Sequence, residues 1–172
     1  MSKRLAILGI LVFGLLGAAP VRAADEGDGP VAGRTGLPVP RFVTLRSAEV
    51  NMRTGPGTRY PVEWVFMRKD LPVEITAEFD TWRRIRDAEG TEGWVHQSML
   101  SGRRGVVITG EIRSLRRAPG PGTAVVARAE PGVVGRLRKC KDQWCELDLE
   151  GYRGWMPRND FWGVYPDEAV ED

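Results

Sequence analysis

The two cysteines are the residues whose spacing points most directly to a chemical bond. Four residues separate Cys140 from Cys145, and a two-residue turn at Asp142 and Gln143 would place the cysteines opposite each other on neighbouring strands. Directly opposed residues of an antiparallel pair have Cα atoms about 4.5–5.5 Å apart, which a disulfide accepts. The spacing differs from the C-x-x-C of redox motifs. We therefore predict a structural disulfide between Cys140 and Cys145 rather than free thiols or a redox pair.

The single histidine gives little support for catalysis. His96 would need a nucleophile and an orienting partner, and Ser98 nearby forms no known constellation with it. One His and two Cys cannot build a His-rich or Cys-rich metal site, and the Asp and Glu residues form no paired-carboxylate motif. The stretches Gly55–Gly57 and Pro119–Gly122 lack the GxxxxGK[ST] pattern of a phosphate loop and indicate turns. We expect no catalytic residues, no cofactor and no metal.

The six tryptophans are better suited to binding than to catalysis. A tryptophan offers a large flat surface and one N–H donor, and it is favoured at interfaces. A small domain also needs large residues to fill its core, so core packing and ligand binding both stay open for each ring. The six are Trp64, Trp82, Trp94, Trp144, Trp155 and Trp162.

The part of the chain that must position these residues contains one unit twice. Asn51–Pro56 matches Ser114–Pro119, and Glu89–Trp94 matches Glu150–Trp155, with an offset that drifts only from 63 to 61. The boundary falls near Gly102–Gly105. Each copy has about 60 residues, the small end of what folds alone. We therefore expect two tandem domains, 41–102 and 103–168, followed by an acidic tail at 169–172.

Each copy carries short runs of β-branched and aromatic residues between turn residues, and helical periodicity is absent. Val73, Ile75, Ala77 and Phe79 alternate with Glu74, Thr76 and Glu78, which predicts a strand with one buried and one wet face. Five or six short strands in so few residues favour a small β-barrel. The predicted strands are Phe42–Leu45, Val62–Met67, Pro72–Phe79, Trp82–Arg86 and Glu92–His96 in the first copy, and Val106–Thr109, Ala124–Ala129, Val133–Cys140, Trp144–Leu149 and Tyr152–Met156 in the second.

Comparison of the two copies adds a prediction about the hairpins. The positions of Cys140 and Cys145 correspond to Glu78 and Arg83 in the first copy, an opposed charge pair. One hairpin would then be closed by an ion pair and the other by a covalent bond.

The first 23 residues have the three-part pattern of a secretory signal peptide. Lys3 and Arg4 precede the uncharged run Leu5–Ala19, and small residues then favour cleavage between Ala23 and Ala24. The alternative is an uncleaved anchor, but the run has 15 residues and a bilayer span needs about 20. We expect a periplasmic or secreted protein with no membrane span after cleavage. Such a compartment favours the disulfide.

Removal of the signal peptide changes the charge of the chain. It takes away three of 25 basic residues and leaves 22 against 23 acidic ones, so the mature net charge is −1. Nucleic acid is therefore not an expected partner. Residues 24–40, with four Gly, three Pro and no aromatic residue, predict a disordered tether. Ten basic residues against two acidic ones lie between Arg103 and Lys141; they suit a solvated shell or a basic face for anionic envelope polymers.

The first copy resembles the bacterial Src-homology-3 (SH3b) domain. The ending Gly154-Trp155 … Phe161–Tyr165 is similar to an exported tandem SH3-like family of Gram-negative bacteria. The resemblance covers roughly 41–168 and implies an all-β fold of two small barrels. Its motif consists of Asn51, Arg53, Gly55, Pro56, Tyr60, Pro61, Val62, Trp82, Ile85, Gly90, Gly93, Trp94, Val95 and Leu100.

The resemblance also implies a binding face. Aromatic residues at matching positions of SH3-like barrels line a surface groove, which makes Tyr60, Trp82 and Trp94 candidates, and Asn51 or Arg53 would anchor a carbonyl or carboxylate. The expected function is non-enzymatic binding of a cell-envelope ligand, first of all a peptidoglycan stem peptide. The alternative is a periplasmic protein–protein adaptor whose barrels pack as one scaffold. The oligomeric state stays open.

Overall fold

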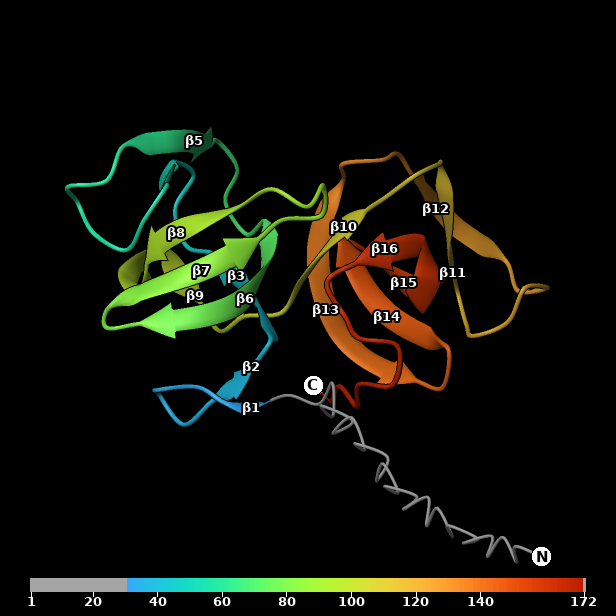
Figure 1. Cartoon of the computed structure of the whole chain (residues 1–172). Helices are drawn as coiled ribbons and strands as arrows, with labels where there is room; N and C mark the ends of the chain where they lie inside the picture. Colours follow the sequence, from blue (N-terminus) through green and yellow to red (C-terminus); the bar gives the residue numbers. More distant parts are fainter. Residues whose placement is uncertain (1–30, 172) are drawn as a thin grey trace, which may run out of the picture.

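A computed structural model describes residues 31–171. The predicted signal peptide and cleavage site, 1–24, and the tether residues up to 30 lie outside the described residues. The described chain forms two seven-stranded antiparallel sheets, each wrapped around its own core (Figure 1). The predicted all-β class with two small barrels is confirmed. Among residues 31–171, no helix is long and apolar enough to cross a membrane.

The two sheets have the same strand order. In the first it is β5-β4-β8-β7-β6-β3-β9, and in the second β12-β11-β15-β14-β13-β10-β16, so the internal repeat corresponds strand by strand. The first barrel comprises β3 (Arg41–Leu45), β4 (Val50–Arg53), β5 (Val62–Phe66), β6 (Pro72–Phe79), β7 (Trp82–Arg86), β8 (Glu92–His96), the 3-10 turn η1 (Gln97–Met99) and β9 (Leu100–Ser101). The second comprises β10 (Gly105–Ile108), β11 (Arg113–Arg116), β12 (Val125–Ala129), β13 (Val134–Lys141), β14 (Trp144–Leu149), β15 (Tyr152–Pro157), η2 (Arg158–Asp160) and β16 (Phe161–Trp162).

The sequence pattern placed the long strands well and missed several shorter ones, among them β9 and β16. The bounds of β6, β7, β8 and β14 agree with the prediction, and most others differ by one residue at an end. The strands β4 and β11 were not predicted, because their sequences, Val-Asn-Met-Arg and Arg-Ser-Leu-Arg, carry few β-branched residues. Their alternation is still visible in burial, since Met52 and Leu115 are fully buried between exposed or half-buried neighbours.

A β-bulge in β6 changes which of its side chains face the core. The register passes from Ile75 opposite Ile85 to Ala77 opposite Arg84, so β6 contains one more residue than its partner β7. Side chains beyond Thr76 are therefore turned to the opposite face from the one that simple alternation predicts. The prediction is right for Ile75, which is buried, and wrong for Phe79, which is half exposed.

Glu78 is the residue that the bulge turns inwards. Its side chain is 1% exposed, and Arg83 opposite it is also buried; the Glu78 Oε1 atom lies 3.5 Å from Arg83 Nε and 2.7 Å from Arg41 Nη2. The predicted charge pair is confirmed, whereas the predicted wet position of Glu78 is wrong. Glu74 was also expected on the wet face and is buried, because the second barrel covers it.

Residues 31–40 differ from the predicted disordered tether. The two-residue strands β1 (Val31–Ala32) and β2 (Pro38–Val39) pair in a hairpin, and Val39 is buried. Thr35 at the tip donates from its N–H and its hydroxyl to the Glu78 carboxylate, at 2.9 and 2.8 Å. A run rich in Gly and Pro is thus ordered by one buried acceptor that composition does not reveal.

The second hairpin is closed by the predicted disulfide. Cys140 and Cys145 are opposed in β13 and β14, their Cα atoms are 4.0 Å apart, and the turn between them is at Asp142 and Gln143. The C-terminal segment covers this end of the barrel. Val170, expected in an acidic tail, joins the second core, and its carbonyl accepts from the Cys140 N–H at 2.9 Å.

The two barrels pack against each other through an aromatic contact. The ring of Phe42 in β3 lies edge-on to Trp162, with centroids 4.8 Å apart, and 4.7 Å from the centroid of Tyr165. The Tyr165 hydroxyl donates to Glu74 Oε1 at 2.8 Å. Burial and this hydrogen bond raise the pKa of Tyr165 well above its ordinary value, so the hydroxyl keeps the proton that it donates.

Glu78→Gln should destabilise the first barrel, because it leaves Arg41 and Arg83 without their shared carboxylate. Burial alone would raise the pKa of Glu78, but the hydrogen bonds from Thr35 and Arg41 outweigh it and lower the pKa from 4.5 to about 2. Since the folded pKa is depressed, this stabilisation is complete above about pH 4.5 and is lost as pH falls towards 2.

We expect Glu78→Gln to cost roughly 3 kcal/mol of unfolding free energy at pH 7 and to flatten the loss of stability between pH 4.5 and 2. Denaturant unfolding across that pH range measures both effects. Glu63→Gln, on the exposed part of β5, is the matched control. Equal behaviour of the two variants would contradict a stabilising role of the Glu78 cluster.

Cys145→Ala should destabilise the second barrel by about 2 kcal/mol or somewhat more, because the closed loop is short. Native-state hydrogen exchange should show lower protection in β13 to β15 and little change in β6 to β8. A reductant should reproduce this loss in the wild type and add nothing in the variant. Unchanged protection of β13 and β14 would show that the bridge contributes no stability.

Candidate functional site

Three adjacent strands of the first barrel present polar and aromatic side chains on their outer face. Strands β4, β8 and β7 lie side by side, and Arg53 is paired with Trp94, which is paired with Arg84. Two residues further along these strands, and so on the same face, Trp82 is opposite His96. The inward positions between them are buried, so alternation aims all these side chains away from the core.

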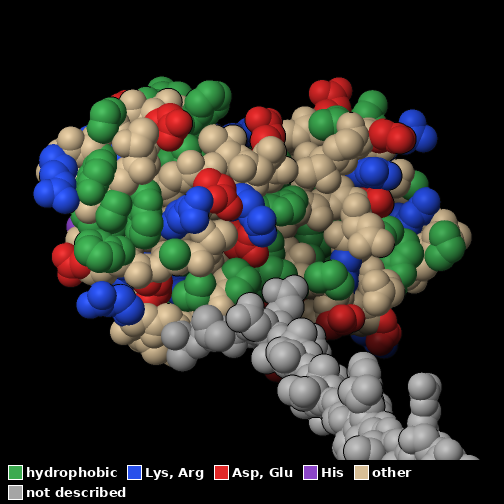
Figure 2. Space-filling model, viewed as in Figure 1, with side chains coloured by type: hydrophobic (Ala, Val, Ile, Leu, Met, Phe, Trp, Pro, Cys, Tyr) green, Lys and Arg blue, Asp and Glu red, His purple; other side chains and the backbone are tan. Residues whose placement is uncertain are grey.

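This face carries a cavity of about 290 Å³. Three of the five predicted binding residues line it: Asn51, Arg53 and Trp82. Its remaining walls come from residues that the sequence interpretation did not assign to a site: Glu49, Thr58, His96, Ser98 and Met99. Figure 2 shows hydrophobic side chains gathered on the first barrel at the side away from the second barrel.

Trp82 and His96 form the aromatic wall of the cavity. Their rings lie edge to face, with centroids 5.5 Å apart. His96 Nδ1 lies 2.7 Å from the Ser98 hydroxyl and accepts from the Ser98 N–H at 3.3 Å, which caps η1. His96 is therefore held by the turn that follows it. The sequence did carry a signal for this position: His96 follows Trp94 by two residues in a predicted strand, so both side chains belong on the same face of the sheet.

Arg53 organises the loop between β4 and β5. Its Nη1 donates to the carbonyls of Tyr60, at 2.7 Å, and Thr58, at 3.3 Å. The Tyr60 ring packs against Gly55, where an added Cβ would come within 2.4 Å of the ring. The close approach explains the glycine. Arg53 thus makes two hydrogen bonds to carbonyls of its own chain. Tyr60 packs over its own loop and does not line the cavity.

Trp94 and Tyr60 stay predictions as binding residues. Trp94 lies on the same outer face as Trp82, next to Arg53 and Arg84, but not in the lining of the cavity. Trp82, Trp94 and Tyr60 are all half-buried and none belongs to the core cluster. Within the described part of the chain, no three His, Cys, Asp or Glu side chains come close enough together to hold a metal ion.

The second barrel carries a cavity of about 350 Å³ at the corresponding place. Ser114, Arg116 and Trp144 stand where the first barrel has Asn51, Arg53 and Trp82, and Arg116 likewise donates to a loop carbonyl, that of Thr123, at 2.8 Å. The position of His96 is taken by Pro157, and an Arg113–Asp160 ion pair at 3.1 Å lines the cavity. The scaffold is repeated, but the polar groups are different.

The two copies match a known domain. The family described as Bacterial SH3 domain matches residues 46–102 and again residues 110–163, more than half of the chain, and each match falls on one of the two sheets. The chain belongs to the bacterial SH3 domain family. The Asn51 and Trp82 cavity and its counterpart at Ser114 and Trp144 are thus equivalent surfaces of two tandem SH3 domains.

Two solved structures are similar to these tandem SH3 domains at low sequence identity. NlpC2 from Trichomonas vaginalis is 10% identical with a TM-score of 0.35, and the match covers 76% of this chain and 51% of that one. NlpC1 from the same organism is 12% identical with a TM-score of 0.34, and covers 71% and 45%. This chain therefore spans about half of their length. No curated protein matches it.

Because the Trp82 and Trp94 rings lie on the outer face, each Trp→Ala substitution should cost less than about 1.5 kcal/mol of unfolding free energy. Ile85→Ala, in the core of the same hairpin, should cost about 2–5 kcal/mol. Urea unfolding of the three variants compares these costs. A loss of 3 kcal/mol or more at either tryptophan would place that ring in the core and remove it from the site.

Proposed function

We propose that this chain is an exported, non-enzymatic binding module that recognises a ligand of the cell envelope, in first place a peptidoglycan stem peptide. The observation that carries the proposal is the cavity of the first barrel, where the half-buried Trp82 ring stands beside the Asn51 amide and His96. Its volume of about 290 Å³ is at the small end of ligand sites. Its shallow, outward position suits a segment of an extended peptide.

The chemistry of the lining fits a peptide. A flat ring gives contact area at low entropic cost, and the Asn51 amide offers both a donor and an acceptor for a peptide group. Arg53 lines the same wall and keeps its positive charge, since its two contacts are with neutral carbonyls. A carboxylate on the ligand would meet this charge. Export through the predicted signal peptide would bring the module to such a ligand.

An adaptor function is the second candidate, and the packing between the barrels favours it. The Phe42, Trp162 and Tyr165 contact joins the two domains into one body, as a scaffold requires. Strand β5 and the residue after it also expose apolar side chains at the edge of the sheet: Trp64 in β5 is 51% exposed, and Met67 directly after β5 is 72% exposed. An envelope protein, rather than the wall, would then be the partner.

Sedimentation with purified sacculi tests the wall-binding function. The wild type should pellet with the wall, and Trp82→Ala should stay in the supernatant, because it removes the aromatic wall of the cavity. Trp64→Ala is the matched control, an exposed tryptophan of the same barrel outside the cavity lining. Tyr60→Ala and Trp94→Ala then show whether the groove extends to those rings.

A wild type that stays soluble with sacculi would overturn wall binding and leave the adaptor function. Equal loss of pelleting in Trp82→Ala and Trp64→Ala would overturn the assignment of the cavity. Thermal unfolding of each variant, measured beside the pull-down, ensures that a loss of binding does not follow from a loss of folding.

A further inference from the structure

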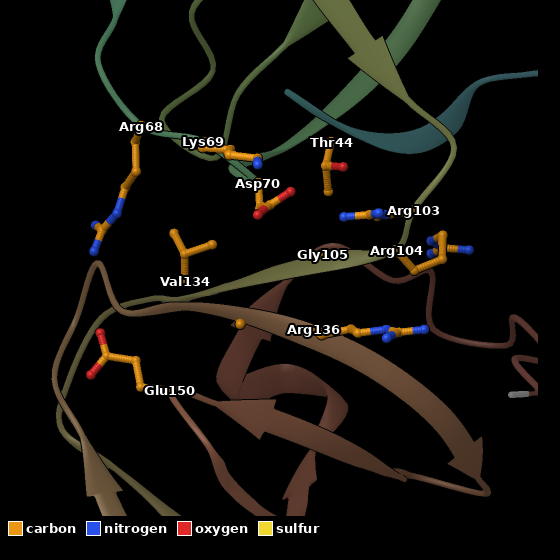
Figure 3. Close-up of a pocket in the computed structure, with 11 residues that line it drawn as sticks. Thr44, Arg68, Lys69, Asp70, Arg103, Arg104, Gly105, Val134, Arg136 and Glu150 are labelled. Carbon is orange, nitrogen blue, oxygen red and sulfur yellow. The ribbon is translucent and has the colours of Figure 1, made fainter. Parts of the chain in front are cut away.

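A third cavity, of about 340 Å³, lies between the two barrels (Figure 3). Three separate segments contribute basic side chains to it. Arg68 and Lys69 come from the turn between β5 and β6, Arg103 and Arg104 from the linker between the barrels, and Arg136 from β13. The cavity therefore exists only in the tandem protein.

Most of this positive charge is not neutralised by the chain. Arg104 is paired with Glu168, whose Oε2 accepts from Nη2 at 2.9 Å. Arg68 donates to the carbonyl of Gly132 at 2.5 Å, a neutral partner that leaves its charge in place. Within residues 31–171, Lys69, Arg103 and Arg136 have no ion-pair partner.

Two carboxylates reduce the positive charge without cancelling it. Asp70 and Glu150 also line the cleft, and neither has a salt-bridge partner among the described residues. Without the Arg104–Glu168 pair, four cations face these two anions, a net charge of +2. The charges come from both barrels and the linker, so the fold brings basic side chains from three segments to the walls of one cavity.

The packing between the barrels fixes the geometry of the cleft. Gly105 opens β10 at its base, and a Cβ there would lie 2.5 Å from Thr44 Cγ2 and 2.9 Å from the Asp70 carbonyl oxygen, both in the first barrel. Only glycine permits this approach of the two domains. Figure 3 shows Arg68, Lys69 and Asp70 reaching into the cleft from the first barrel, with Val134 and Arg136 on the opposite wall.

We propose that this cleft binds a compact oxyanion, a phosphate or carboxylate group. The four cations that line the cleft without an ion-pair partner among the described residues would attract an anion, and the planar guanidinium of Arg103 or Arg136 matches an oxyanion with paired N–H donors. The volume is that of a small-ligand site. The site lies apart from the Trp82 cavity, and the proposal does not depend on the wall-binding function.

NMR titration of the tandem protein at low ionic strength tests the site, with inorganic pyrophosphate and tricarballylate as phosphate and carboxylate probes. Saturable amide shifts should appear at 68–70, 103–105 and 134–136. Saturation by one probe alone identifies the chemistry of the source, and saturation by both assigns the site to oxyanions in general. Affinity should fall as salt rises, because the attraction is screened.

Arg103→Gln and Lys69→Gln should each weaken the bound probe about tenfold, as expected for the loss of one charged hydrogen bond. Glu150→Gln should strengthen binding, because it removes a competing negative charge; a misfolded protein would not give this gain. Arg128→Gln, an exposed position of β12 outside the cleft lining, makes the same charge change and should leave affinity unchanged. Trp82→Ala should also leave it unchanged.

Absence of saturable shifts at the three segments with both probes would overturn the site. An equal loss of affinity in Arg103→Gln and Arg128→Gln would also overturn it, because that result would show attraction to the overall charge of the protein and not to this cleft. A weaker affinity in Glu150→Gln would equally contradict the proposal. By contrast, a Trp82→Ala variant that still pellets with sacculi would contradict only the assignment of the Trp82 cavity and would not affect this proposal.

Discussion

Both barrels depend on how the far end of their longest hairpin is closed. The bulge in β6 turns Glu78 towards the inner face, where a lone carboxylate would be costly, and Arg83 and Arg41 compensate it. At the same position the second barrel has the Cys140–Cys145 bond. The turn beyond each closure starts β7 or β14, whose first residue, Trp82 or Trp144, lines a cavity. Closure of the hairpin therefore positions the candidate site.

The pairing of residues within a hairpin was predictable from the sequence. The burial of residues by segments far away in the chain was not. The opposition of Cys140 and Cys145 follows from the length of one turn, and the repeat gave the correspondence with Glu78 and Arg83. The bulge at Thr76 has no sequence signal of its own, because an extra residue in a strand leaves the same alternating letters. The ordered hairpin at 31–39 and the buried Val170 were missed for a related reason: each is fixed by a partner far along the chain.

The candidate site shows the same division. Asn51 and Trp82 were found from the motif that they share with the family, and the structure places both in one cavity. His96 was considered only as a catalytic base, although strand alternation sets it beside Trp82. Arg53 was expected to contact a ligand, and its hydrogen bonds show that it also holds the Tyr60 loop. A motif identifies the positions of a site. Which of those residues contacts a ligand and which holds a loop in place follows only from the three-dimensional structure of the loop.

The contact between the barrels has a consequence for the order in which the chain folds. Phe42 and Glu74 belong to the first barrel, yet Trp162 and Tyr165, which come later in the chain than the whole first barrel, cover them. Translation runs from the N-terminus, and domains generally form as units in that order. The first barrel thus emerges with an aromatic ring and a carboxylate facing water. Its surface is completed only after residues 162–165 have been made, so a chain that stops before residue 162 leaves Phe42 and Glu74 exposed on a barrel that is otherwise complete.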